Sequence, residues 1–114
     1  MTQEKFVKIY LEENGEITPL DAYREFAIMR LSAIILNLRK QGMDIRTDYT
    51  TSKNRFGVLV TYATYKLNRL YKVEYDWQGE KCVDYIKAYD NKELKEKFKK
   101  NFSGILTDYY VVEK

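Results

Sequence analysis

Hydrophobic side chains recur at helical spacing near the start of the chain. In residues 3–13, Ile9 follows Phe6 by three positions and Tyr10 follows it by four, and Asn14-Gly15 comes directly after the run. This spacing places the three side chains on one face of a helix, and a glycine commonly follows a helix end. The pattern predicts a first helix over residues 3–13.

The second helix is predicted by its start signal. Thr18 precedes Pro19, and Asp21 lies three residues after the threonine. A threonine caps the first backbone N–H groups, proline at the first helical position loses no hydrogen bond, and an acid at the third position completes the cap. We expect this helix to run to about Phe26.

The third helix, predicted over residues 28–41, has the clearest division into two faces. One face is an apolar stripe, and Gly42 supplies a stop. The stripe consists of Leu31, Ile34, Ile35 and Leu38. The other face is polar or small and follows steps of three and four. It carries Arg30, Ala33, Asn37 and Gln41, with Lys40 beside them.

A β-hairpin is predicted after this helix. Residues 43–49 and 58–67 alternate with a period of about two, and residues 50–57 form a basic tip between them. Three helices followed by a hairpin is the order of a winged helix-turn-helix. The expected fold class is therefore α+β, with a winged helix-turn-helix domain over residues 1–69.

The remaining residues, 70–114, predict a small ββαβ unit. Two alternating runs flank Gln78-Gly79, a helix begins near Asp90 and ends before Gly104, and residues 105–113 form a last strand. The first strand should turn its aromatic side chains toward the apolar helix face. Those side chains are Tyr71, Tyr75 and Trp77, with Val73 between them, and the helix face is Leu94, Phe98 and Phe102. A unit of about 45 residues buries little surface, so it should pack on the winged domain or on a second copy.

Composition narrows the function. The chain has 114 residues, one cysteine and no histidine. An internal disulfide and a cysteine-cluster zinc site are excluded, and the commonest general base is missing. We predict no catalytic residues, metal or cofactor, and no enzyme. No apolar run approaches the ~20 residues of a membrane span, and residues 1–16 lack secretory-signal features, so we expect a cytoplasmic protein without membrane contact.

The net charge of +3 is unevenly distributed along the chain. Residues 1–23 carry −3, residues 24–69 carry +6, and residues 70–114 are balanced. A basic excess confined to the central block is what a polyanion-binding surface requires, although a solvated face would look the same.

The segment over residues 3–67 resembles the small helix-turn-helix proteins that bacteriophages and prophages often encode. The similarity rests on Thr18-Pro19-Leu20-Asp21-Ala22, on Arg30-Leu31 and on Leu38-Arg39-Lys40-Gln41-Gly42. The resemblance implies DNA binding, with Arg30 at the entry of the recognition helix and Lys53, Asn54 and Arg55 in the wing. One departure is Ala27, because such proteins usually have glycine in the turn.

Two functions of different classes follow as hypotheses. In the first, the chain is a phage-type, sequence-specific transcriptional regulator in a bacterial host. Helix 28–41 reads the major groove of double-stranded DNA, and wing 50–57 contacts the backbone. The predicted DNA contacts are Arg30, Ala33, Asn37, Lys40, Gln41, Lys53, Asn54 and Arg55. Each has an ordinary alternative: Arg30 could pair with Glu25 or Asp21, and the others could be solvated side chains.

In the second hypothesis, the chain is a phage-encoded inhibitor of a host defence system, such as an anti-CRISPR protein, and binds a host or phage protein. Its working surface would be the tyrosine-rich tail. Under the first hypothesis the same tail would instead join two copies in a homodimer or add a contact. The candidate residues are Tyr71, Tyr75, Trp77, Tyr109 and Tyr110. Tyrosine is enriched at protein interfaces, but it also suits the half-buried face of a sheet.

Overall fold

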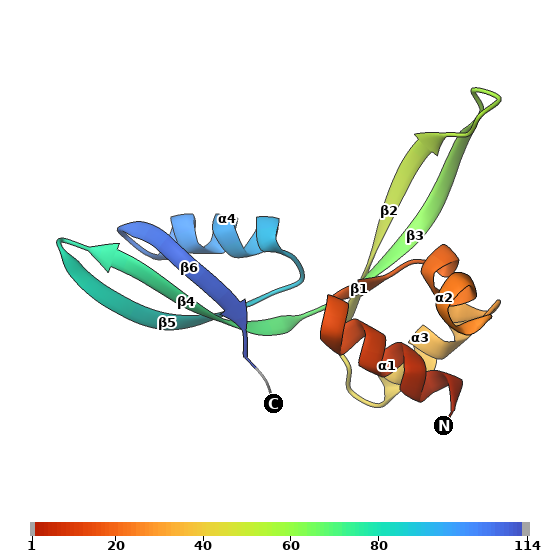
Figure 1. Ribbon diagram of the computed structural model, residues 1–114, viewed down its shortest axis with the longest axis horizontal. Helices are drawn as coiled ribbons and strands as arrows, with labels where there is room; N and C mark the ends of the chain where they lie inside the picture. Colours follow the sequence, from red (N-terminus) through yellow and green to blue (C-terminus); the bar gives the residue numbers. More distant parts are fainter. Residues whose placement is uncertain (1, 113–114) are drawn as a thin grey trace. The chain divides into compact units, whose positions relative to one another are not determined.

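The computed structural model describes residues 2–112, and the chain divides between Leu67 and Asn68 into two compact units (Figure 1). Within the described residues the units contain four helices and two three-stranded antiparallel sheets. The α+β fold class is confirmed.

The first unit has the predicted three helices followed by a hairpin. Its helices are α1 (Gln3–Asn14), α2 (Pro19–Phe26) and α3 (Leu31–Lys40), and its strands are β1 (Glu16–Ile17), β2 (Ile45–Lys53) and β3 (Leu59–Leu67). The sheet order is β1-β3-β2. Sequence reasoning missed β1, whose two residues pair with Lys66 and Tyr65, because two residues are too short to show a period.

The start of α2 forms as predicted. The Asp21 backbone N–H donates to the Thr18 hydroxyl at 3.1 Å, and the Thr18 N–H donates to the Asp21 carboxylate at 3.0 Å. This reciprocal pair satisfies two N–H groups that the helix cannot bond internally. It fixes the direction in which the chain enters the helix-turn-helix.

The predicted bounds of the third helix, 28–41, were too wide, because α3 begins only at Leu31. Ala27 takes a left-handed conformation with φ +55°, and the Ile28 N–H bonds back to the Ala22 carbonyl at 3.1 Å. This bond closes the C-terminus of α2. Residues 28–30 are consequently the connection between the helices, and Arg30 precedes the first helical residue.

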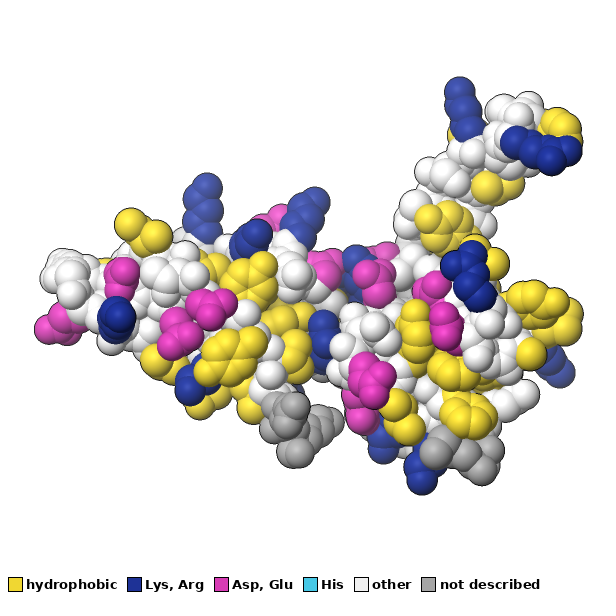
Figure 2. Space-filling view, in the orientation of Figure 1, with side chains coloured by type: hydrophobic (Ala, Val, Ile, Leu, Met, Phe, Trp, Pro, Cys, Tyr) yellow, Lys and Arg dark blue, Asp and Glu magenta, His cyan; other side chains and the backbone are white. Residues whose placement is uncertain are grey.

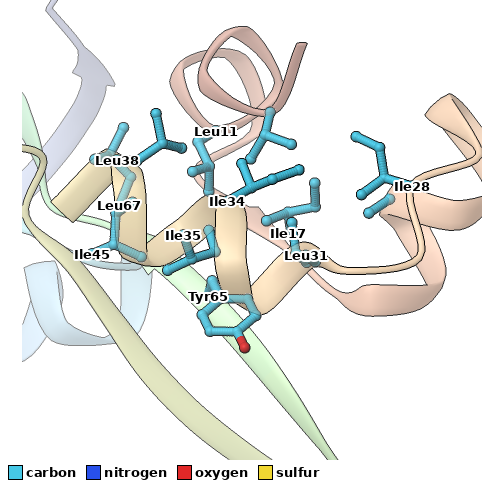
Figure 3. Close-up of a cluster of buried hydrophobic side chains, with 12 residues drawn as sticks. Leu11, Ile17, Ile28, Leu31, Ile34, Ile35, Leu38, Ile45, Tyr65 and Leu67 are labelled. Atoms are coloured by element: carbon cyan, nitrogen blue, oxygen red, sulfur yellow. The ribbon is translucent and has the colours of Figure 1, made fainter. Parts of the chain in front are cut away.

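The apolar stripe of α3 lies in the core of the first unit, as predicted (Figure 3). Side chains from α1, β1 and the β2–β3 hairpin pack with it. They are Val7, Leu11, Ile17, Ile45, Tyr65 and Leu67. Because this stripe is buried, the opposite side of α3 must face outward.

The second unit has the predicted ββαβ order. Its elements are β4 (Arg69–Trp77), β5 (Glu80–Ala88), α4 (Asn91–Asn101) and β6 (Ile105–Val111), with sheet order β5-β4-β6. Residue 113, the end of the predicted last strand, lies outside the described residues. Helix α4 covers one face of the sheet, and Leu94 and Phe98 pack there with Tyr71 and Val73.

Trp77 does not join this core, contrary to expectation, and 44% of its surface is exposed. The pairing of β4 with β6 ends at Asp76, opposite Ile105, whereas Trp77 pairs only with Glu80 in β5. The tryptophan therefore lies one residue beyond the three-stranded part of the sheet.

Candidate nucleic-acid interface

The outward side of α3 is formed by Ala33, Leu36 and Lys40, all of which are exposed. A helix turns by about 100° per residue, so these three positions lie opposite the buried Leu31 and Leu38. Leu36 is 53% exposed, and sequence reasoning missed it as an interface residue. The sequence contained the information needed to find Leu36, because the apolar stripe alone fixes which residues of the helix lie on the opposite side.

The amides of Asn37 and Gln41 flank the outward side and are bonded to α1. The Asn37 Nδ2 donates to Glu4 Oε1 at 3.0 Å, and the Gln41 Nε2 donates to Glu4 Oε2 at 3.1 Å. One carboxylate thus holds both predicted base-reading amides. Any contact of these amides with a base edge must compete with Glu4.

Arg39 fastens α3 to the first strand of the wing. Its Nε donates to the Ile45 carbonyl at 3.0 Å, and its Nη2 donates to the Thr47 hydroxyl at 2.7 Å. This basic side chain at the end of α3 consequently sets the angle between helix and wing.

Arg30 is exposed at the N-terminus of α3. The alternative that it pairs with Glu25 or Asp21 is not realised, since no ion pair joins it to either residue within the described chain. Asp21 instead completes the cap of α2. The guanidinium is therefore available where a recognition helix would enter a groove.

The wing is a long two-stranded ribbon. Strands β2 and β3 have nine residues each, which corresponds to about 30 Å at ~3.3 Å per residue. Lys53 and Arg55 are exposed at its end, where Figure 2 shows basic side chains, and the Arg55 guanidinium lies 4.8 Å from the centre of the Phe56 ring. The tip thus presents two cations without an acidic residue between positions 49 and 65.

Asn54, predicted as a DNA contact, builds the turn of the wing. Its Oδ1 accepts hydrogen bonds from the backbone N–H groups of Phe56 at 2.9 Å and Val58 at 3.1 Å. Asparagine often stabilises turns by such local bonds. Its oxygen is engaged in shaping the tip that carries Lys53 and Arg55.

A charge cluster stabilises the base of the wing. The Asp48 carboxylate lies 2.9 Å from the Nε of Arg46 and 3.2 Å from the Nζ of Lys66. Burial opposes ionisation of Asp48, but hydrogen bonds from the two cations outweigh it and lower the pKa of the carboxyl below its usual value. Arg46 and Lys66 face each other across β2 and β3, so Asp48 relieves the repulsion between them.

Further along the wing, several apolar side chains are exposed. Tyr49 is 74% exposed, Phe56 76% and Leu59 65%. The alternating pattern correctly predicted strands here, but only the half of the ribbon next to the helices has a core to cover its apolar side chains.

The tyrosines of the second unit fall into two groups. Tyr71 is only 2% exposed, and Tyr75 packs on the rings of Phe98 and Phe102 with centroid distances of 5.2 and 5.6 Å. Tyr109 is half-buried in the same core. Burial under α4 contradicts a role in a binding surface for Tyr71. Tyr75 and Tyr109 are half-buried beside the same helix, and their role in binding stays a prediction. Tyr110 and Trp77 are exposed.

The described residues offer neither a grouped set of metal ligands nor a membrane-spanning helix. Across residues 2–112, no three side chains of histidine, cysteine, aspartate or glutamate are grouped so that they could hold a metal ion. No helix in that range has the length and hydropathy needed to cross a membrane.

Comparison with known protein families matches residues 2–70 to the winged helix-turn-helix domain. The matched region covers more than half of the chain and includes α1, α2, α3 and the whole wing. No curated protein and no solved structure gives a significant match.

Proposed function

The chain belongs to the winged helix-turn-helix domain family, and we propose that it is a sequence-specific DNA-binding protein that regulates transcription. The observation that carries the proposal is the exposed side of α3 beside a basic, projecting wing. The major groove of B-DNA admits one helix, and the second helix of a helix-turn-helix pair is the one that enters it.

In this proposal Arg30 makes the specific contact of α3. Residues at the N-terminus of a recognition helix reach base edges, and an arginine can form a bidentate pair with guanine. Ala33 and Leu36 offer small and apolar contacts of the kind that suit the methyl group of thymine. Lys40 lies at the other end of α3 and is suited to a phosphate.

Lys53 and Arg55 carry the second part of the contact. Both are exposed at the tip of the wing, and neither forms an ion pair among the described residues. Their role is to neutralise phosphates, which contributes affinity but little sequence preference. The Asn54 turn and the Asp48 cluster hold the wing in shape from its two ends.

The biological setting follows from the resemblance of residues 3–67 to proteins of bacteriophages and prophages. It supports a phage or prophage regulator that works in the cytoplasm of a bacterial host.

The test compares two variants on duplexes selected from a random pool, at several salt concentrations. Arg30→Ala should erode sequence preference by about 1–3 kcal/mol at one base position. Lys53→Ala with Arg55→Ala should weaken binding to all duplexes alike and flatten the slope of log affinity against log salt by about two.

A matched control removes two lysines from the second unit. Lys99→Ala with Lys100→Ala changes the net charge by the same amount but leaves the wing intact. It should keep the salt slope of the parent chain. If the parent chain binds no duplex even at low salt, or if the wing pair behaves like this control, the proposal is wrong.

The exposed apolar side chains of the wing favour a second candidate function, inhibition of a host defence protein such as a CRISPR nuclease. Tyr49, Phe56 and Leu59 offer an apolar surface of the kind that protein partners bury. The discriminating experiment is capture of the defence nuclease with and without removal of nucleic acid. This function would be favoured over DNA binding if the nuclease is still captured after nucleic acid has been removed, and if Tyr49→Ser and Leu59→Ser abolish that capture.

A further inference from the structure

The sheet of the second unit has one face under α4 and one open face. Side chains alternate between the two faces along each strand. Every second residue of β4, together with the residues paired with it in β5 and β6, therefore lies on the open face. Its large apolar side chains are strongly exposed. They are Leu70 (37%), Val83 (52%), Tyr85 (53%), Ile105 (73%) and Tyr110 (45%).

The charges on this face are divided along the strand direction. At one end Lys72 and Lys87 lie without an acid, which gives +2. At the other end Glu74, Asp76 and Asp108 lie with Lys81, which gives −2. The whole face is neutral, so a nucleic acid would release few counterions on binding here.

We propose that this open sheet face binds the same face of a second copy of the chain. The two sheets would stack with their two-fold axis in the interface and perpendicular to the strands. In that arrangement Lys72 of each copy faces Glu74 of the other, and the basic end of each face covers the acidic end of its partner. A two-fold axis parallel to the strands is disfavoured, because it would place Lys72 on Lys72 and Glu74 on Glu74.

Two apolar pairs form in the same arrangement. Tyr85 of one copy faces Val83 of the other along β5. Ile105 in β6 faces Val112, which follows the end of β6 and whose backbone N–H donates to the Leu70 carbonyl. The like-charged pair, Lys81 against Lys87, falls on β5, an outer strand of the sheet, where water and salt screen it. Leu70 and Tyr110 face the carboxylates of Asp76 and Asp108, so these two apolar side chains gain no apolar partner across the interface. An isologous contact of this kind is the commonest form of homodimer.

The size of the face sets the expected strength. Three strands about 4.8 Å apart and four rows of outward residues give a footprint of about 400 Å² per copy. Stable complexes bury about 800 Å² per partner. The dimer should therefore be weak, with a dissociation constant in the micromolar range or above.

The test is sedimentation of the full chain, without DNA, over a concentration series that spans this range. The parent chain should pass from monomer to dimer. Lys72→Glu and Glu74→Lys should each weaken the dimer at least tenfold, because each creates two like-charged pairs. Mixed in equal amounts, the two variants should associate again, since every lysine in the mixed dimer would face a glutamate. The control Lys100→Glu, on the exposed side of α4, should leave association unchanged.

Three results would overturn the proposal: a monomer at every concentration, single variants that associate as the parent chain does, or mixed variants that remain monomeric. Circular dichroism of each variant confirms that the sheet is folded. The proposal does not depend on DNA binding, and the measurement contains no DNA, so its failure would leave the proposed function untouched.

Discussion

The carboxylate of Glu4 accepts a hydrogen bond from the amide of Asn37, 33 residues further along the chain, at 3.0 Å. The same carboxylate holds Gln41 at 3.1 Å, so α1 places a negative charge beside the helix proposed to read DNA. This contact joins the two helices. Under the proposed function, the negative charge of Glu4 also opposes the approach of phosphates, and its oxygens occupy two amides that suit adenine.

Glu4→Gln should therefore strengthen DNA binding. Removal of one negative charge near the interface is worth about 0.5–1 kcal/mol, or roughly twofold to fivefold in affinity at low salt. Glu13→Gln is the matched control, because nine residues along α1 place it on the opposite side of the helix. Titration of one selected duplex with both variants measures the difference. Equal affinities would show that α1 lies away from the DNA.

The Glu4 contact shows why the sequence predicted the fold better than the site. The apolar stripe of α3 and the Thr18–Asp21 cap depend on residues within a few positions of each other, and both formed as predicted. The polar face was traced in steps of three and four from Arg30, a path that drifts toward α1 instead of following the outward side. The bond to Glu4 is a long-range contact, which no local period contains.

The turn of the wing gives the same lesson. A basic tip was evident from Lys53 and Arg55, but the engagement of the Asn54 oxygen by two backbone N–H groups depends on how the turn closes. In the second unit, alternation correctly placed Tyr71 and Val73 on the helix side. It placed Trp77 there too, because the pattern does not reveal where pairing with β6 stops.

Ala27→Gly should stabilise the helix-turn-helix. Ala27 holds φ +55°, a conformation that costs an L-residue about 1–2 kcal/mol. Glycine avoids this cost but loses more chain entropy on folding, which offsets about 0.5–1 kcal/mol. The expected net gain is about 0.5–1 kcal/mol, measured by thermal or urea unfolding. Ala33→Gly is the control within α3 and should destabilise by about 1 kcal/mol; a loss of similar size at Ala27 would contradict the turn geometry.

Gly104→Ala should disrupt the second unit. Gly104 has φ +110°, and an added Cβ would collide with the backbone carbonyl oxygen of Asp76. Backbone strain and this clash together should cost about 3 kcal/mol or more and should loosen β6 from β4. Gly57→Ala in the wing tip separates the two causes, because φ is +78° there but nothing lies within 4 Å of the added atom. Hydrogen exchange of the β6 amides measures the effect, and unchanged protection would show that the β4–Gly104 contact is not as close as described.

Asp48→Asn should weaken the base of the wing in a pH-dependent manner. Ionised Asp48 pairs with Arg46 and Lys66, and its pKa in the folded chain lies below the usual value. A lowered folded-state pKa means that the stabilisation is fully present above the unfolded pKa of about 3.9 and disappears as the pH falls through the folded value. The side chain is about one-third exposed, so the contribution at neutral pH should be about 0.5–1 kcal/mol.

The measurement is the free energy of unfolding of the parent chain and Asp48→Asn between neutral pH and pH 2. The two curves should differ at neutral pH and converge below pH ~4, because protonated aspartic acid and asparagine are both uncharged. Glu13→Gln, which removes an exposed carboxylate of the same unit, should show no such convergence around the pKa of Asp48. A constant gap between the parent chain and Asp48→Asn at every pH would mean that packing or hydrogen bonding of the side chain, and not its charge, holds β2 and β3 together where Arg46 faces Lys66.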